Sequence, residues 1–234
     1  ELSERERAGK GLTRPEIAVL MSYAKLWLYD EILDSDLPEA KDLEQDLISY
    51  FPEPLREKYK TAICDHQLRR ELIATMITNS MINRVCESFV TDLMERTSVL
   101  PSEVARAYIV ARACFNVREI WAEIESLDNK IPSTAQVSLL LRVNQLLERV
   151  TFWLLRNVDH PMDLGATTAE FAPSVRRLAQ NIENVIPPGV QKRANEWTAR
   201  FKREGAPEPL ARQMGHLMLQ VSALDIVRTA SACK

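Results

Sequence analysis

The sequence predicts an all-α protein built as a multi-helix bundle, and three observations lead to this prediction. Apolar residues recur at helical spacing through almost the whole chain. Gly and Pro are scarce, with 6 and 12 among 234 residues, which argues against a turn-rich all-β fold. Finally, Ser/Thr-x-x-Glu/Gln patterns, which are typical of helix N-termini, open several of the apolar runs.

The first strong helix signal starts at Thr13. Thr13 and Glu16 make a capping-box pattern, in which the Glu16 carboxylate can reach back to Thr13. Pro15 falls in the first turn, where its missing N–H leaves no intrahelical bond unmade. The run that follows has the spacing of one helix face: Ile17, Leu20, Met21, Ala24 and Leu28.

The longest predicted helix runs from about Thr61 to Arg96. Its apolar residues keep near-helical spacing throughout: Leu68, Leu72, Ile73, Met76, Ile77, Ile82, Val85, Phe89 and Leu93. At 1.5 Å per residue this helix would span roughly 50 Å. We therefore expect other helices to pack along most of its length.

Two further long helices are predicted in the middle of the chain, over Val104–Leu127 and Gln136–Arg156. The second has apolar residues on nearly every side, so we expect it to be central, with Trp153 as an anchor in the core. Capping-box patterns at Ser133–Gln136 and Thr167–Glu170 mark two expected helix starts.

A loop-rich stretch at 157–165 suggests how the chain is organised. We expect a main helical bundle over residues 1–156, and further helices over 157–234 that pack on the same bundle. The chain has no initiator Met, opens on a charged segment and stops abruptly. We therefore expect a piece of a longer protein, truncated at its C-terminus.

The charge balance limits the partners that the chain could have. Lys plus Arg is 30 and Asp plus Glu is 33, so the net charge is −3 and a chain-wide nucleic-acid footprint is not expected. No uncharged stretch approaches the roughly 20 apolar residues of a membrane-spanning helix, so we expect no membrane partner. The four cysteines lack metal-ligand spacing, and free thiols are typical of a cytoplasmic protein.

One basic segment invites a nucleic-acid interpretation: Lys192, Arg193, Arg200, Lys202 and Arg203. Glu196 and Glu204 interrupt it, and the aromatic residues Trp197 and Phe201 fall on the apolar stripe of the expected helix. Core packing explains these aromatic residues better than base stacking does.

A search for catalytic motifs finds no nucleotide-binding Gly pattern, P-loop, zinc-protease or nucleophile-elbow signature. Asp65 and His66 could form a general base with an orienting carboxylate, but an early-turn role for His66 is favoured. Arg69 and Arg70, beside Glu71, fit a solvated helix face or an interface to another domain. Phosphate binding is the less favoured alternative. No catalytic, cofactor or metal residue is assigned.

The most informative polar residues are Asn79, Asn83 and Arg84, which lie among apolar residues of the long predicted helix. Asn79 and Asn83 are i, i+4 neighbours on one face, and Asn is a poor helix-interior residue. If that face is buried, the amides need partners. We expect the two amides to form hydrogen bonds with backbone groups of a neighbouring element. The alternative is that they form part of a ligand site.

Several long motifs together carry a family resemblance. They are Gly11–Lys25 (GLTRPEIAVLMSYAK), Tyr50–Arg56 (YFPEPLR), His66–Val85 (HQLRRELIATMITNSMINRV), Val104–Tyr108 (VARAY) and Arg118–Asp128 (REIWAEIESLD). In this order they resemble the large NAD-specific glutamate dehydrogenases of bacteria, and specifically part of the helical C-terminal region. The likeness covers about Gly11 to Arg156 and is thinner beyond Asn157.

The resemblance implies a parent chain several times longer, whose central domain oxidises L-glutamate to 2-oxoglutarate and ammonium with NAD as the hydride acceptor. It implies that the NAD site and the catalytic residues belong to that domain and not to this segment. The implied partners are the catalytic domain of the same chain and further copies in a homo-oligomer. A free-standing helical scaffold for protein partners remains the alternative.

Overall fold

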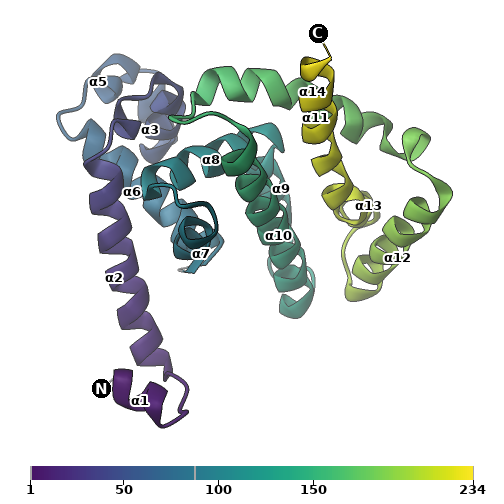
Figure 1. Ribbon diagram of the computed structural model, residues 1–234, viewed down its shortest axis with the longest axis horizontal. Coiled ribbons are helices and arrows are strands. Elements are labelled where there is room, and N and C mark those ends of the chain that lie inside the picture. The colour runs from purple at the N-terminus through teal and green to yellow at the C-terminus, as the bar shows by residue number, and fades with distance from the viewer. Residues whose placement is uncertain (1, 87, 234) are drawn as a thin grey trace. The chain divides into compact units, whose positions relative to one another are not determined.

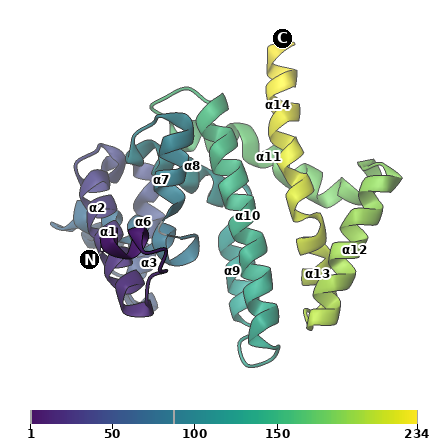
Figure 2. The same ribbon diagram turned by 60° about the horizontal axis from the view of Figure 1, so that its bottom comes forward.

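A computed structural model describes residues 2–86 and 88–233, and in these ranges the regular secondary structure is entirely helical. The predicted all-α class is confirmed. The chain divides into two compact units, Glu1–Ala105 and Arg106–Lys234. Figures 1 and 2 give two views of the helices, and each unit is described by itself below.

The first unit is built around the packing of α2 against α6, with η1 and α3 also contacting α6. Its core includes Leu28 and Ile32 of α2 together with Ile73, Ala74, Ile77 and Met81 of α6. The elements in order are α1 (Leu2–Arg7), α2 (Arg14–Leu33), η1 (Leu37–Glu39), η2 (Lys41–Leu43), α3 (Glu44–Tyr50), α4 (Glu53–Arg56), α5 (Lys60–Cys64), α6 (Arg69–Arg84), α7 (Ser88–Thr97) and the start of α8 (Pro101–Cys114).

Helix α2 begins where the sequence predicts. The Glu16 carboxylate accepts hydrogen bonds from the Thr13 N–H and the Thr13 hydroxyl, both at 2.7 Å, so the predicted capping box forms. The same carboxylate pairs with Arg5 of α1 at 2.8 Å. These contacts hold α1 beside the N-terminal end of α2, as Figure 1 shows.

The single long helix predicted from Thr61 to Arg96 is wrong. Helices α5, α6 and α7 occupy the region instead, and position 87 lies outside the described residues. The first break follows Cys64, where the His66 Nδ1 atom accepts a hydrogen bond from the Leu68 N–H at 3.0 Å. The second follows Arg84, where Val85 leaves the helical backbone with φ −110° and ψ −80°. Separate helices can turn their apolar faces onto one compact core, which a 50 Å rod could not do.

The second unit contains three pairs of packed helices: α9 with α10, α11 with α14, and α12 with α13. Figures 1 and 2 both show α9 beside α10 and α12 beside α13. After the end of α8, the elements are α9 (Val117–Glu125), α10 (Ser133–Asn157), α11 (Leu164–Val185), α12 (Pro188–Glu204), α13 (Glu208–His216), η3 (Leu217–Val221) and α14 (Ser222–Ala232).

The helix predicted over Val104–Leu127 is also divided, into α8 and α9. Asn116 separates them with a left-handed backbone at φ 49°. Asn tolerates this conformation better than most residues with a Cβ atom. Its position lets Val117, Ile120, Trp121 and Ile124 of α9 be buried on the new helix axis.

The predicted central helix is confirmed as α10, with a continuous buried stripe that includes Leu139, Val143, Leu146, Val150 and Leu154. Trp153 is half-buried rather than deep in the core, which corrects its predicted role as an anchor. Its indole N–H donates to Asp225 at 2.7 Å, and its ring packs edge-on against Phe171 with centroids 5.5 Å apart.

The helix start predicted at Ser133 is confirmed, because α10 begins at that residue. Its N-cap is Pro132, which has no side-chain cap, and the Gln136 side-chain amide donates to the Ile124 carbonyl at 3.1 Å. The capping box predicted at Thr167–Glu170 is wrong. Thr167 and Glu170 lie inside α11, which begins earlier and is capped by Asp163, whose carboxylate accepts from the Ala166 N–H at 2.7 Å. Short sequence patterns cannot distinguish these competing caps.

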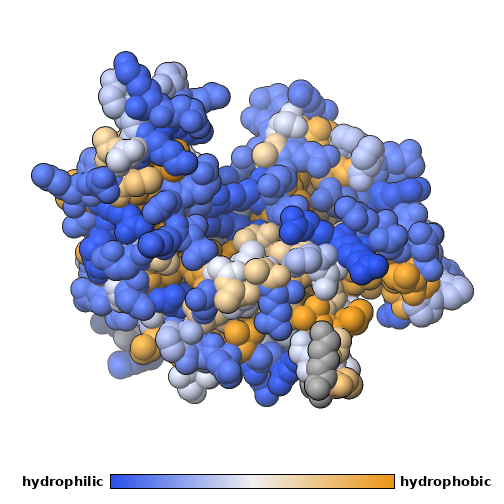
Figure 3. All heavy atoms as spheres, turned by 90° about the horizontal axis from the view of Figure 1, so that it is seen from above, coloured by the Kyte–Doolittle hydropathy of each residue, from blue (hydrophilic) through white to orange (hydrophobic). Residues whose placement is uncertain are grey.

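The subdivision predicted near residue 157 stays a prediction. No helix among the described residues is long and apolar enough to cross a membrane. Figure 3 shows one face of the molecule, on which hydrophilic side chains predominate and apolar ones gather in smaller patches.

Candidate functional sites

Arg69 and Arg70 begin α6 and hold the segment that follows α2. Both guanidinium groups pair with the Glu39 carboxylate, Arg69 at 3.4 Å and Arg70 at shorter range. Arg70 also donates to the backbone carbonyls of Leu33 at 2.5 Å and Ser35 at 3.1 Å. The predicted polar pair is therefore a contact within the first unit, which closes the α2–η1 corner onto the start of α6.

Asn79 and Asn83 are exposed side chains on α6, and Arg84 is half-buried at the end of the helix. The buried face of the helix carries Ile73, Ile77 and Met81 instead. Among the described residues the two amides make no hydrogen bond to a neighbouring element, and the partners expected for them stay a prediction. Both amides are available to groups outside the unit.

The unpredicted feature of the first unit is the apolar surface of α2. Leu28 and Ile32 are its fully buried residues, and both lie near its C-terminal end. Large apolar side chains toward the N-terminal end are 36 to 67% exposed: Ile17, Val19, Leu20, Tyr23, Leu26 and Trp27. The sequence prediction followed one apolar face of this helix and missed the second.

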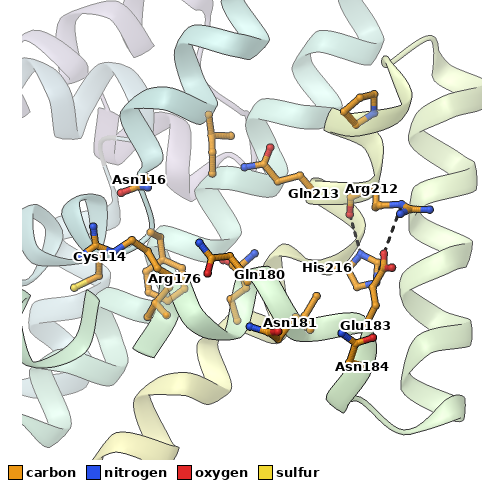
Figure 4. Close-up of a pocket in the computed structure, with 17 residues that line it drawn as sticks. Cys114, Asn116, Arg176, Gln180, Asn181, Glu183, Asn184, Arg212, Gln213 and His216 are labelled. Atoms are coloured by element: carbon orange, nitrogen blue, oxygen red, sulfur yellow. Dashed lines mark hydrogen bonds and ion pairs between the residues drawn. The ribbon is translucent and has the colours of Figure 1, made fainter. Parts of the chain in front are cut away.

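The second unit carries a groove of about 520 Å³, shown in Figure 4. Its lining comes from the α8–α9 junction, from α11 and from α13. The labelled polar groups are Cys114, Asn116, Arg176, Gln180, Asn181, Glu183, Asn184, Arg212, Gln213 and His216. The groove is thus rich in amide and guanidinium groups.

His216 is a buried titratable group of this groove, with 4% of its surface exposed. Its Nδ1 atom lies 2.9 Å from the Arg212 carbonyl oxygen, so this nitrogen carries the proton. Its Nε2 atom then accepts from the Gln191 side-chain amide at 3.2 Å. Glu183 lies 3.9 Å from Nε2 and 3.5 Å from the Arg212 guanidinium. These contacts fasten α12 and α13 to the end of α11.

The groove offers hydrogen bonds and charge rather than an activated nucleophile. Burial raises the pKa of the Cys114 thiol to about 12, so the thiol is protonated at neutral pH. Within the described ranges, no group of three or more His, Cys, Asp or Glu side chains is placed to hold a metal ion. Sequence analysis missed the groove because its residues belong to separate helices.

Basic side chains around Trp197 make ring contacts and ion pairs within the second unit. The guanidinium groups of Arg142 and Arg200 lie 4.4 and 5.0 Å from the Trp197 ring centroid. Arg200 also pairs with Glu204 at 2.8 Å, and Lys202 pairs with Glu208 at 3.1 Å. Trp197 itself stacks on the buried Phe201 with centroids 5.8 Å apart. The aromatic residues are thus packing groups, as the sequence favoured.

The described part of the chain is helical, and comparison with known proteins gives its family. Residues 9–234 match the family described as glutamate dehydrogenase, C-terminal. The chain belongs to this family. The likeness therefore extends well beyond the Gly11–Arg156 region in which the sequence motifs lie.

Three relatives carry the name NAD-specific glutamate dehydrogenase. The chain is 35% identical to that of Halomonas elongata and 33% identical to that of Pseudomonas aeruginosa, in each case over 98% of this chain. It is 32% identical to that of Mycobacterium tuberculosis over 97% of this chain. The chain spans 14% of the length of each relative.

Proposed function

We propose that this chain is the non-catalytic, helical C-terminal domain of an NAD-dependent glutamate dehydrogenase. The parent polypeptide would convert L-glutamate, NAD and water to 2-oxoglutarate, ammonium and NADH. The observation that carries the proposal is the family match over residues 9–234, combined with the 14% share of each relative that the chain spans. NAD would bind elsewhere in the parent chain.

The role we propose for the domain is packing against the rest of the parent, in support of assembly or domain closure. Two exposed features support it. The first is the apolar surface of α2, whose large side chains are 36 to 67% exposed, and exposed apolar patches of this kind mark interaction sites. The second is the polar face of α6, where Asn79 and Asn83 are exposed and Arg84 is half-buried at the helix end.

The parent would be a homo-oligomer in the cytoplasm. Large metabolic enzymes are commonly closed, symmetric assemblies. Four unpaired cysteines fit a reducing compartment. Residues 1–156 would form the main bundle of the domain, with 157–234 added to it.

A deletion in the full-length polypeptide tests the packing role. Removal of residues 9–234 should abolish the native oligomeric state and glutamate-dependent NAD reduction, while NAD binding by the remaining chain persists. Light scattering, absorbance at the NADH band and a binding titration measure these three properties. An unchanged assembly with unchanged activity would contradict the proposal, and so would glutamate oxidation by the 234-residue chain alone.

A further inference from the structure

We propose that one stripe of α2 is the surface on which the dehydrogenase domain of the same polypeptide packs. The stripe consists of Val19, Leu20, Tyr23, Leu26 and Trp27. This inference rests on the function proposed above and adds the docking element and its partner. It follows from the geometry of the helix, from the exposed area and from the length of the relatives.

The stripe is separate from the face by which α2 joins its own unit. A helix turns about 100° per residue, so the five residues fall within an arc of about 120°. Leu28 and Ile32, which are fully buried, fall on the other side of the helix, about 140° and 180° from the centre of that arc. Helix α2 is therefore apolar on two sides, although its own unit covers one side only.

A helix that is apolar on opposite sides is stable when both sides are buried. Most helical stability in proteins comes from packing and not from intrinsic propensity. The N-terminal two-thirds of α2 has no fully buried residue, yet Tyr23 is 67% exposed and Leu26 is 60% exposed. A covering partner would explain why this segment carries large apolar side chains.

The size of the stripe favours a partner on the same polypeptide. A large aromatic side chain has about 150–250 Å² to bury, and on that scale the exposed parts of the five side chains amount to on the order of 500 Å². Independent partners that form stable complexes bury about 800 Å² each. A second copy held by this stripe alone would bind weakly, whereas a domain joined covalently is present at high effective concentration.

The relatives supply such a partner. The chain spans 14% of their length, so most of each relative lies outside the matched region. Under the proposed function, the dehydrogenase domain is within that remainder.

The chemistry of the stripe defines what should cover it. Tyr23 and Trp27 are the residue types that most often anchor interfaces, because each combines a large apolar ring with one polar hydrogen. In the described part of the chain neither side chain has a hydrogen-bond partner. The surface that covers them should be an apolar groove with two hydrogen-bond acceptors. Asp30 lies at the C-terminal end of the same arc, so we expect the partner surface to place a basic side chain beside that groove.

Photo-cross-linking in the full-length polypeptide tests this inference. The variants Tyr23→p-benzoylphenylalanine and Leu26→p-benzoylphenylalanine place the probe on the stripe, at exposed positions where the probe should not disturb folding. Leu141→p-benzoylphenylalanine is the matched control, because Leu141 is a 55% exposed apolar residue of α10, a helix that belongs to the second unit. After irradiation, electrophoresis separates cross-links within one polypeptide from those between two, and peptide mass spectrometry locates them.

The expected result is cross-linking within one polypeptide, from positions 23 and 26 to peptides of the dehydrogenase domain, with no such products from position 141. A second measurement uses cysteine accessibility, in which Leu26→Cys should react with a polar maleimide about tenfold or more slowly than Leu141→Cys, because covered groups react through local opening.

Three results would overturn the inference: cross-links that double the polypeptide mass, the same products from position 141, or equal maleimide rates at positions 26 and 141. A separate outcome concerns the proposed function. If the full-length polypeptide lacks glutamate-dependent NAD reduction before any probe is introduced, the proposed function fails whatever the cross-links are.

Discussion

Gly215 allows α12 and α13 to approach closely beside His216. An added Cβ atom there would lie 2.2 Å from the Thr198 hydroxyl and 2.7 Å from the Ala194 carbonyl oxygen. The carbonyl is part of a helix backbone and cannot move away easily. Gly at this position is therefore a packing requirement, and it explains how His216 reaches Gln191 on α12.

Substitution of Gly215 by Ala should destabilise the second unit by about 1–3 kcal/mol, because it overpacks the α12–α13 contact. Gly189→Ala is the matched control, since nothing lies within 4 Å of its added Cβ atom. In helix α12 that change should be stabilising by about 0.5–1 kcal/mol. Urea unfolding measures both, and equal effects would contradict the close packing at Gly215.

Cys114 should be the unreactive thiol of the second unit. Burial raises its pKa from 9.0 to about 12 and shields the sulfur from reagents, whereas Cys233 is exposed. Iodoacetamide at pH 8 should modify Cys233 and leave Cys114 intact, as peptide mass spectrometry would show. Fast modification of Cys114 in the native protein would contradict its burial.

The same shift makes stability depend on pH in the alkaline range. Because the folded-state pKa is above the unfolded-state value, the unfolded chain loses this proton first as pH rises. The contribution of Cys114 to the free energy of unfolding should be complete below about pH 9 and decrease between pH 9 and 12. Cys114→Ala should remove that part of the pH dependence, and an unchanged profile would contradict it.

Among the elements, the connection from α2 to α6 depends on one arginine. Arg70 joins the Glu39 carboxylate to the backbone carbonyls of Leu33, at the end of α2, and Ser35 just beyond it. Arg70→Ala leaves the two carbonyls without this donor and Glu39 with Arg69 alone, and should destabilise the first unit by about 1–3 kcal/mol. Arg177→Ala, at an exposed position on α11, should change stability by less than about 0.5 kcal/mol. Circular dichroism during urea unfolding distinguishes the two, and similar losses would contradict the role of Arg70.

The junction of α8 and α9 depends on the left-handed backbone of Asn116. Asn116→Gly should keep or slightly increase stability, because Gly adopts a positive φ without strain. Asn116→Val should be destabilising by about 1–2 kcal/mol, because a β-branched side chain clashes in this conformation. Thermal unfolding measures the pair. Equal melting temperatures would mean that the junction rearranges.

Comparison of the predicted and observed helices shows which features of the fold the sequence could predict. Helix α10 and the start of α2 follow from apolar spacing and one capping box, both of which are local signals. The breaks at His66, Val85 and Asn116 do not, because a periodic apolar pattern continues across a change in helix direction. The groove brings Arg176 and His216 together from separate helices, so the spacing of residues along the sequence does not predict the groove.

At the scale of the whole molecule, the exposed residues say more about possible partners than the buried residues do. The core of each unit accounts for the apolar spacing of most helices. The second stripe of α2 is not accounted for in the same way, and it indicates a partner. Asn79 and Asn83 are exposed on α6, and the partners predicted for their amides stay a prediction.

The central claim is that this domain belongs to a large glutamate-oxidising enzyme, and the most direct measurement is made on the native protein. An antibody raised against the 234-residue chain would capture the native polypeptide, whose mass and glutamate-dependent NADH formation are then determined. From the 14% share of its relatives, we expect an active polypeptide roughly seven times the length of this chain. An inactive polypeptide of about 26.7 kDa would contradict the account and favour a free-standing helical scaffold.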